Sequence, residues 1–301
     1  MRIIGHTKER AALKEAIQQG NITQAYLFTG PSGIGKSLCA LECAAWLAHE
    51  PDFEPSEDKP FPYDVMVVKP LTETKRSVTK VKNIPAESIR EALTFLGQFP
   101  VAGGYRVLII EDAHRMSETA QNVLLKTLEE PPSTAVILLV THEVGAILPT
   151  VLSRVKRVRF DFVSEESIRE DIALRYTGTD MDSIAPFFFA LGRPGMILSA
   201  LEHPEAFVLD RELLGSLFRL SALSLSERLA LAERLALHTE RTIRLLEWWL
   251  GGLYRQAQKM TEKKMTTRFF LLLDETEATL RLLKTTQSNA RLLLEKLFLA
   301  V

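Results

Sequence analysis

Short apolar runs rich in β-branched residues alternate with helical segments from residue 24 to about residue 160. This alternation is typical of a parallel β-sheet wrapped by helices, because parallel strands need long crossover connections. We expect helices to begin near Ser37, Pro85 and Ser117, the last with its serine as the N-cap. The expected strands are AYLFT, DVMVVK, RVLII, AVILLVT and VKRVRF.

Strand signals stop near residue 162, and the rest of the chain follows the apolar period of helices. Short helices are expected over 164–176, 180–191 and 194–202, and a leucine-rich helical pattern continues from about residue 206. The predicted fold class is α/β plus all-α. The expected domains are an α/β domain over 1–161, a small three-helix domain over 162–205 and a larger helical domain over 206–301.

The composition describes a globular protein with a large core. Hydrophobic residues make up 46% of the 301 residues, and the formal net charge is −1, so any DNA contact must come from local patches or partners. No apolar stretch reads as a signal peptide or membrane span, which predicts a cytoplasmic protein. Cys39 and Cys43 are interpreted as buried helix thiols, since two cysteines cannot build a four-cysteine zinc site.

The segment GPSGIGKS predicts a phosphate-binding loop. Gly30, Gly35, Lys36 and Ser37 fit the pattern G-x-x-x-x-G-K-[ST] between an apolar strand and an amphipathic helix. Backbone N–H groups and the helix N-terminus would hold phosphate, Lys36 would reach the outer phosphates, and the Ser37 hydroxyl could ligate Mg²⁺. The alternative is an ordinary glycine-rich turn or a relic loop. The intervening residues expected to line the nucleotide are Ser32, Gly33 and Ile34.

An acidic pair follows another predicted strand. The apolar residues VLII run directly into Glu111 and Asp112, which places both carboxylates at the carboxyl edge of a buried strand. Ligands of open α/β sheets bind at this edge. We therefore expect the pair to be the second half of a nucleotide site, with Glu111 joining Ser37 on a nucleotide-bound Mg²⁺. A strand that ends in a solvated acidic turn is the alternative.

Three stretches together resemble a known family. QAYLFTGPSGIGKS, VLIIEDAHRMSETAQNVLLKTLEEPP and LPTVLSR, in this order, are similar to the AAA+ subunits of the bacterial DNA polymerase III clamp loader, and most of all to its delta-prime subunits. The C-terminal SNARLLLEKLFLAV resembles the last helix of that family. The resemblance implies a RecA-like AAA+ nucleotide-binding domain over 1–161, a three-helix lid over 162–205 and a helical collar over 206–301 that assembles a five-subunit ring.

The resemblance also implies roles for single residues. Arg154, after Ser153, matches an arginine finger that would reach into the ATP site of the neighbouring subunit. A solvated basic face is the alternative for Arg154. Thr141 matches the polar sensor of the γ-phosphate, although an ordinary strand-end threonine fits almost as well. Ile4 and Gly5 match the segment that packs near adenine.

The departures from the family pattern bear on hydrolysis. ATPase members order the acidic pair Asp then Glu, whereas this chain has Glu111 then Asp112. The lid position that carries a second arginine sensor in those members is Gly195 here, with Arg193 out of register. The loop from about 50 to 62 has no cysteine where many relatives carry a zinc module, so we expect no zinc site there.

The leading hypothesis is a delta-prime-like stator of the clamp loader that binds ATP or ADP with Mg²⁺ and hydrolyses it weakly or not at all. Its implied partners are the gamma or tau and delta subunits, the sliding clamp and primed DNA, in the cytoplasmic replisome. The alternatives are an active gamma/tau-type ATPase subunit and a stand-alone P-loop protein. The basic stretch KRSVTKVK from Lys75 is interpreted as a solvated loop, with DNA contact as its alternative.

Overall fold

The computed structural model describes residues 3–51, 53, 61–75, 78–175, 192–202, 204–259, 267–286 and 288–300. The chain divides into two compact units, Met1–Ser167 and Ile168–Val301. The first holds every strand of the described residues, and the second is helical.

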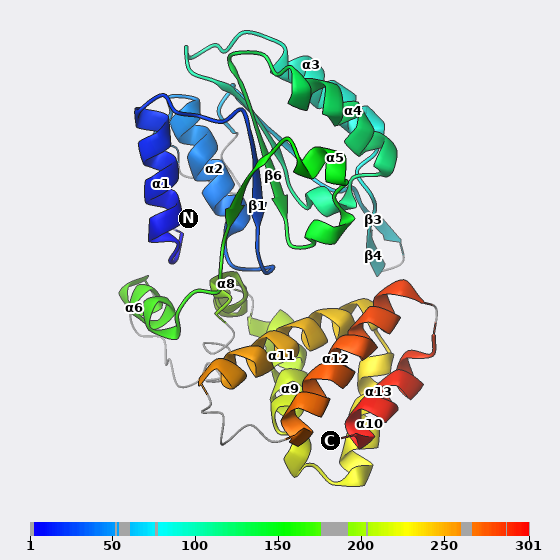
Figure 1. The fold of residues 1–301 in the computed structure, drawn as a ribbon. Helices are drawn as coiled ribbons and strands as arrows, with labels where there is room; N and C mark the ends of the chain where they lie inside the picture. Colours follow the sequence, from blue (N-terminus) through cyan, green and yellow to red (C-terminus); the bar gives the residue numbers. More distant parts are fainter. Residues whose placement is uncertain are drawn as a thin grey trace. The chain divides into compact units, whose positions relative to one another are not determined.

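The first unit is built on a five-stranded parallel sheet with the order β2-β5-β6-β1-β7 (Figure 1). All five strands predicted from the apolar runs are present, and the predicted parallel α/β class is confirmed. The strands are β1 (Ala25–Thr29), β2 (Val65–Val68), β5 (Arg106–Ile110), β6 (Ala135–Thr141) and β7 (Lys156–Arg159).

Helices cover both faces of this sheet (Figure 1). Alternate strand residues point to opposite faces, so Phe28 packs with one set of helices and Leu27 with the other. Because both of their faces are buried, β1, β5 and β6 are continuous buried runs, whereas the edge strand β7 is mostly exposed. One face is covered by α1 (Thr7–Gln18) and α2 (Lys36–Leu47), and the other by α3 (Ala86–Leu96), α4 (Glu118–Glu129) and α5 (Pro149–Leu152).

One local prediction was wrong. The stretch interpreted as a loop from Lys75 takes part in an antiparallel hairpin of β3 (Thr72–Lys75) and β4 (Val78–Val81), in which Thr74 pairs with Thr79. Threonine and valine favour extended backbone even where charged residues lie between them. The side chains of this hairpin lie outside the described residues.

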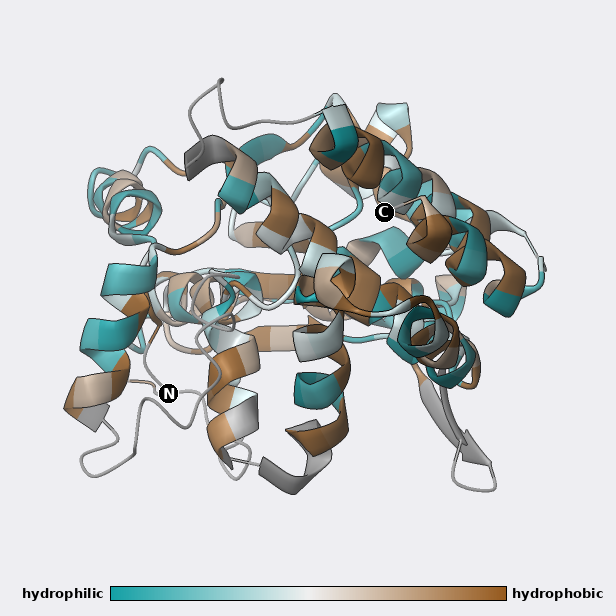
Figure 2. Cartoon of the chain, turned by 90° about the horizontal axis from the view of Figure 1, so that it is seen from below, coloured by the Kyte–Doolittle hydropathy of each residue, from teal (hydrophilic) through white to brown (hydrophobic). Residues whose placement is uncertain are grey.

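The second unit consists of helices that carry hydrophobic and hydrophilic residues on different sides (Figure 2). Trp248 and Trp249, which lie in the helix Thr239–Lys259, are buried. The helix predicted over 180–191 lies outside the described residues, and the division into lid and collar stays a prediction. The described helices are α6 (Glu165–Arg175), which spans the boundary, α8 (Pro194–Glu202), α9 (Pro204–Phe218), α10 (Leu225–Ala236), α11 (Thr239–Lys259), α12 (Thr267–Thr285) and α13 (Ala290–Leu299).

The turn after β1 depends on a glycine at residue 30. Phe160 continues the pairing of β7 with β1, since its N–H donates to the Thr29 carbonyl at 2.8 Å. A Cβ atom at Gly30 would lie 2.1 Å from the Phe160 carbonyl oxygen, and Gly30 has φ of 141°. Both the space and the backbone conformation therefore exclude a side chain at this position.

We predict that Gly30→Ala lowers the free energy of unfolding by more than Gly20→Ala does. Gly20 also has a positive φ, of 70°, but nothing lies within 4 Å of a Cβ built there. Gly20→Ala should therefore cost about 1–2 kcal/mol for the backbone alone, whereas Gly30→Ala should add about 1–3 kcal/mol from the steric clash. Urea denaturation of both variants measures the difference, and equal losses would contradict the clash at Phe160.

Candidate functional site

The carboxyl ends of the parallel strands bring the predicted site residues to one edge of the sheet. The loop of Gly30 follows β1, the acidic pair follows β5, and Thr141 ends β6. Because β6 lies between β1 and β5, the phosphate loop and the acidic pair flank the end of β6. This edge is the general ligand-binding position of open α/β sheets.

The phosphate loop has the backbone that its glycines permit. Gly33 and Gly35 have φ of 74° and 100°, and Gly35 is the N-cap of α2. The Lys36 side chain is buried, with 6% of the residue exposed, and its Nζ donates to the carbonyls of Gly30 at 2.8 Å and Pro31 at 2.5 Å. Lys36 thus points back across the loop, toward the place where a bound phosphate would compete for its charge. Around it, Ile34 is buried, Ser32 and Ser37 are half-buried and Gly33 is exposed.

The N-terminal segment packs against this loop. Ile4 is buried, and a Cβ at Gly5 would lie 2.8 Å from Val163 Cγ1. The His6 Nε2–H donates to the Ile34 carbonyl at 2.8 Å, and burial lowers the pKa of His6. His6, next to the two residues matched to an adenine-side segment, therefore contacts the phosphate loop.

Glu111 is held near the end of the neighbouring strand. Its Oε2 lies 3.5 Å from Lys69 Nζ, just after β2, and 18% of its side chain is exposed. Burial raises the pKa of Glu111, and the Lys69 ammonium opposes this rise. A half-buried carboxylate of this kind can serve as a ligand of a hydrated Mg²⁺.

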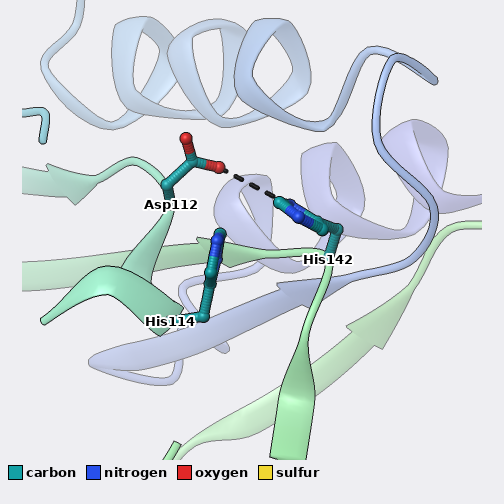
Figure 3. Close-up of side chains that lie close together, drawn as sticks. All are labelled: Asp112, His114 and His142. Carbon is teal, nitrogen blue, oxygen red and sulfur yellow. Dashed lines mark ion pairs between the residues drawn. The ribbon is translucent and has the colours of Figure 1, made fainter. Parts of the chain in front are cut away.

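Asp112 turns toward the end of β6 (Figure 3). Its backbone is left-handed, with φ of 47°, and its Oδ1 lies 3.6 Å from His142 Nδ1. The His142 ring lowers the pKa of Asp112. This carboxylate is therefore stabilised as an anion and is a weaker base than an ordinary aspartate.

His114 completes a cluster that the sequence analysis missed. It lies in the 3-10 turn Ala113–Arg115, and its ring lies 4.2 Å from that of His142. Thr141 Oγ1 is 3.3 Å from His114 Nδ1 and also accepts the Glu143 N–H, so the residue matched to a sensor is buried within the chain's own contacts. Burial lowers the pKa of His114 to about 4. The available signal was that both histidines closely follow strand ends of one parallel sheet.

Arg154 lies apart from the phosphate loop (residues 30–37), just after the end of α5. Its guanidinium donates to Glu129 Oε1 at 2.7 Å, to the Thr150 carbonyl at 2.9 Å and to Ser153 Oγ at 3.1 Å. About a third of the side chain is exposed, 34%, and Glu129 is more exposed still. Exposed pairs of this kind contribute about 0–1 kcal/mol, so the guanidinium can change partners at little cost.

The two cysteines lie in the first unit, and the two residues singled out in the predicted lid lie in the second. Cys39 and Cys43 are buried in the core, and burial raises the pKa of both thiols to about 12. Both side chains are therefore protonated thiols at neutral pH. In the second unit Arg193 is buried, which lowers its pKa to about 10, and Gly195 lies within α8. Most of the loop over 50–62 lies outside the described residues. Among the described helices, none is long and apolar enough to cross a membrane.

Comparison with curated proteins gives relatives that are subunits of DNA polymerase III. The tau subunit of Bacillus subtilis is 31% identical over 172 residues, which are 55% of this chain and 30% of that protein. The tau subunit of Escherichia coli is 28% identical over 287 residues, which are 85% of this chain and 43% of that protein. The chain thus spans less than half the length of these relatives.

Among solved structures, a gamma subunit-related protein of DNA polymerase III from Thermotoga maritima aligns with 97% of both chains, at a TM-score of 0.49 and 20% identity. The Holliday junction branch migration motor RuvB from the same organism aligns with 77% of this chain and 82% of its own, at a TM-score of 0.46 and 19% identity.

The family comparison covers the unit that holds the sheet and the candidate site. The sequence profile of the family described as "DNA polymerase III, delta subunit" matches residues 5–164, which is more than half of the chain. The matched range includes the phosphate loop, the acidic pair and Arg154. The chain therefore belongs to the DNA polymerase III delta-subunit family.

Proposed function

We propose that this chain is a nucleotide-binding subunit of a DNA polymerase III clamp loader, of the delta-prime type. The observation that carries the proposal is the glycine-lined loop with its buried Lys36, at the same sheet edge as Glu111 and Asp112. The loop would hold the phosphates of ATP or ADP, and Ser37 with Glu111 would hold Mg²⁺ through the nucleotide. Membership of the family supports this function.

The chain's own hydrolysis is weak in this proposal. The order Glu111 then Asp112 displaces each carboxylate by about one methylene, and a misplacement of about 1 Å can cost on the order of 10²-fold in rate. Asp112, which takes the place of the base, has a left-handed backbone and a lowered pKa beside His142. Both features weaken its ability to activate an attacking water, whereas phosphate binding does not depend on them.

Arg154 acts on the neighbouring subunit in this proposal. It lies exposed beside Glu129, and its hydrogen bonds to Glu129 and Thr150 are with α4 and α5. A guanidinium released from Glu129 could stabilise the charge that develops on a γ-phosphate across a subunit boundary. The chain would then serve as a stator in a ring with gamma or tau and delta subunits, which loads the sliding clamp on primed DNA.

A second candidate is an active gamma/tau-type ATPase subunit. It is favoured by the curated relatives, which are named as tau and gamma subunits. The two candidates share the nucleotide cradle and differ in the turnover of the isolated chain. Robust turnover that needs Lys36 belongs to the second candidate alone.

We predict that Lys36→Ala weakens nucleotide binding on the order of 10- to 100-fold. A charge-assisted hydrogen bond contributes about 1.5–3 kcal/mol, and the substitution removes the cation that would contact phosphate. Titration with a fluorescent ADP analogue measures the loss. Lys8→Ala, which removes an exposed lysine of α1, is the matched control and should bind like the unsubstituted chain.

The same preparation decides between the two candidates. The isolated chain should bind nucleotide. Its ATP turnover should already be so low that Lys36→Ala does not lower it measurably. If the unsubstituted chain fails to bind nucleotide at all, the phosphate loop does not bind phosphate and the proposed nucleotide function is wrong.

We predict that Arg154→Ala sharply lowers DNA-stimulated ATP hydrolysis by the reconstituted ring. An arginine finger contributes about 10³- to 10⁵-fold to the rate at the site it reaches. Steady-state phosphate release from the assembled ring measures the effect, and gel filtration shows that the variant still assembles. Arg157→Ala, at an exposed position of β7, is the control and should keep the rate. A ring with Arg154→Ala that keeps full activity would refute the finger.

A further inference from the structure

Asp112, His114 and His142 bring three metal-binding side chains together at the ends of two adjacent strands (Figure 3). One ligand atom from each residue lies within 4.8 Å of the others. Two imidazoles and one carboxylate are a ligand set that Zn²⁺ and related transition-metal ions prefer, whereas Mg²⁺ prefers oxygen ligands. The cluster therefore differs in chemistry from a Mg²⁺ site at Ser37 and Glu111.

One of the ligand–ligand distances is close to that around a bound ion, and all three ligand atoms lie within 4.8 Å of one another. Zinc–nitrogen and zinc–oxygen bonds of about 2.1 Å place tetrahedral ligand atoms about 3.4 Å apart. The Asp112 Oδ1 and His142 Nδ1 atoms are already 3.6 Å apart. The side chains of Asp112 and His142 are 46% and 28% exposed, so they can adjust and an ion can enter from solvent. Small side-chain rotations would complete the geometry.

Thr141 orients the third ligand. Its buried Oγ1 accepts the Glu143 N–H at 3.0 Å and can also accept Nδ1–H of His114, which lies 3.3 Å away. That tautomer leaves the lone pair of His114 Nε2 for an ion. A metal-bound histidine usually donates a hydrogen bond from its other ring nitrogen, as Nδ1 would do here to Thr141. Among nearby charges, Glu143 favours a cation at His114 and Arg115 opposes it.

We propose that Asp112, His114 and His142 form a binding site for a divalent transition-metal ion such as Zn²⁺, with a further coordination position open to water. The ligands belong to the first unit alone, and the site does not depend on the proposed nucleotide function. It is also separate from the loop over 50–62, where no zinc is expected. An ion held there would engage Asp112 and keep its carboxylate from activating water.

The test is a titration of the full chain with Co²⁺ in the absence of nucleotide, followed by competition with Zn²⁺. We expect saturable visible absorption of tetrahedral Co²⁺, displaced by Zn²⁺ and not by excess Mg²⁺. Because outer contacts alone are worth about 10–100-fold in metal affinity, His142→Gln and His114→Gln should each weaken binding at least about 100-fold. His238→Gln, which removes an exposed histidine of the second unit, should bind like the unsubstituted chain.

A second variant separates ligation from folding. His142→Cys keeps a ligand at residue 142, so it should retain tight binding and add a thiolate-to-cobalt charge-transfer band that a purely structural role for His142 would not produce. Absence of saturable Co²⁺ absorption in the unsubstituted chain would overturn the site. So would unchanged affinity in His142→Gln and His114→Gln, or a His142→Cys protein that binds Co²⁺ without the new band.

Discussion

Burial of both faces of one parallel sheet determines where this chain can do chemistry. The central strands β1, β5 and β6 are buried on both sides because helices cover both faces of the sheet, so polar groups collect where these strands end. Since all five strands are parallel, their carboxyl ends meet at one edge. Residues as distant in sequence as Gly30, Glu111 and His142 are thus brought to one edge by the packing of apolar residues that have no chemical role.

The two neighbouring carboxylates at this edge are tuned in opposite directions. Burial raises the pKa of Glu111, whereas the imidazole of His142 lowers that of Asp112. Asp112 has a left-handed backbone, and its carboxylate lies toward His142 at the end of β6. A stabilised anion is a good cation ligand and a poor base, so under the proposed function Asp112 would activate water poorly.

The parts of the structure that could be predicted from the sequence are those with a local signal. The strands β1, β5 and β6 are continuous apolar runs. The residues of the phosphate loop follow one another directly in the sequence, from Gly30 to Ser37. The two strand segments of the β3–β4 hairpin, TETK and VTKV, contain no continuous apolar run to give such a signal. The histidine cluster depends on register: Ile110 pairs with Leu139, so β6 continues two residues past the end of β5 and brings Thr141 and His142 beside the acidic turn. No pattern within either segment contains that information.

The two cations expected to serve nucleotide chemistry share one energetic feature. Lys36 donates to neutral carbonyls of its own loop, and Arg154 pairs with a carboxylate that is largely in water. A carbonyl carries only a partial charge, and an exposed ion pair is screened by solvent. A triphosphate carries several negative charges and would compete for both cations, Lys36 within the chain and Arg154 across a boundary. In the proposed function, each side chain would exchange these contacts for phosphate oxygens.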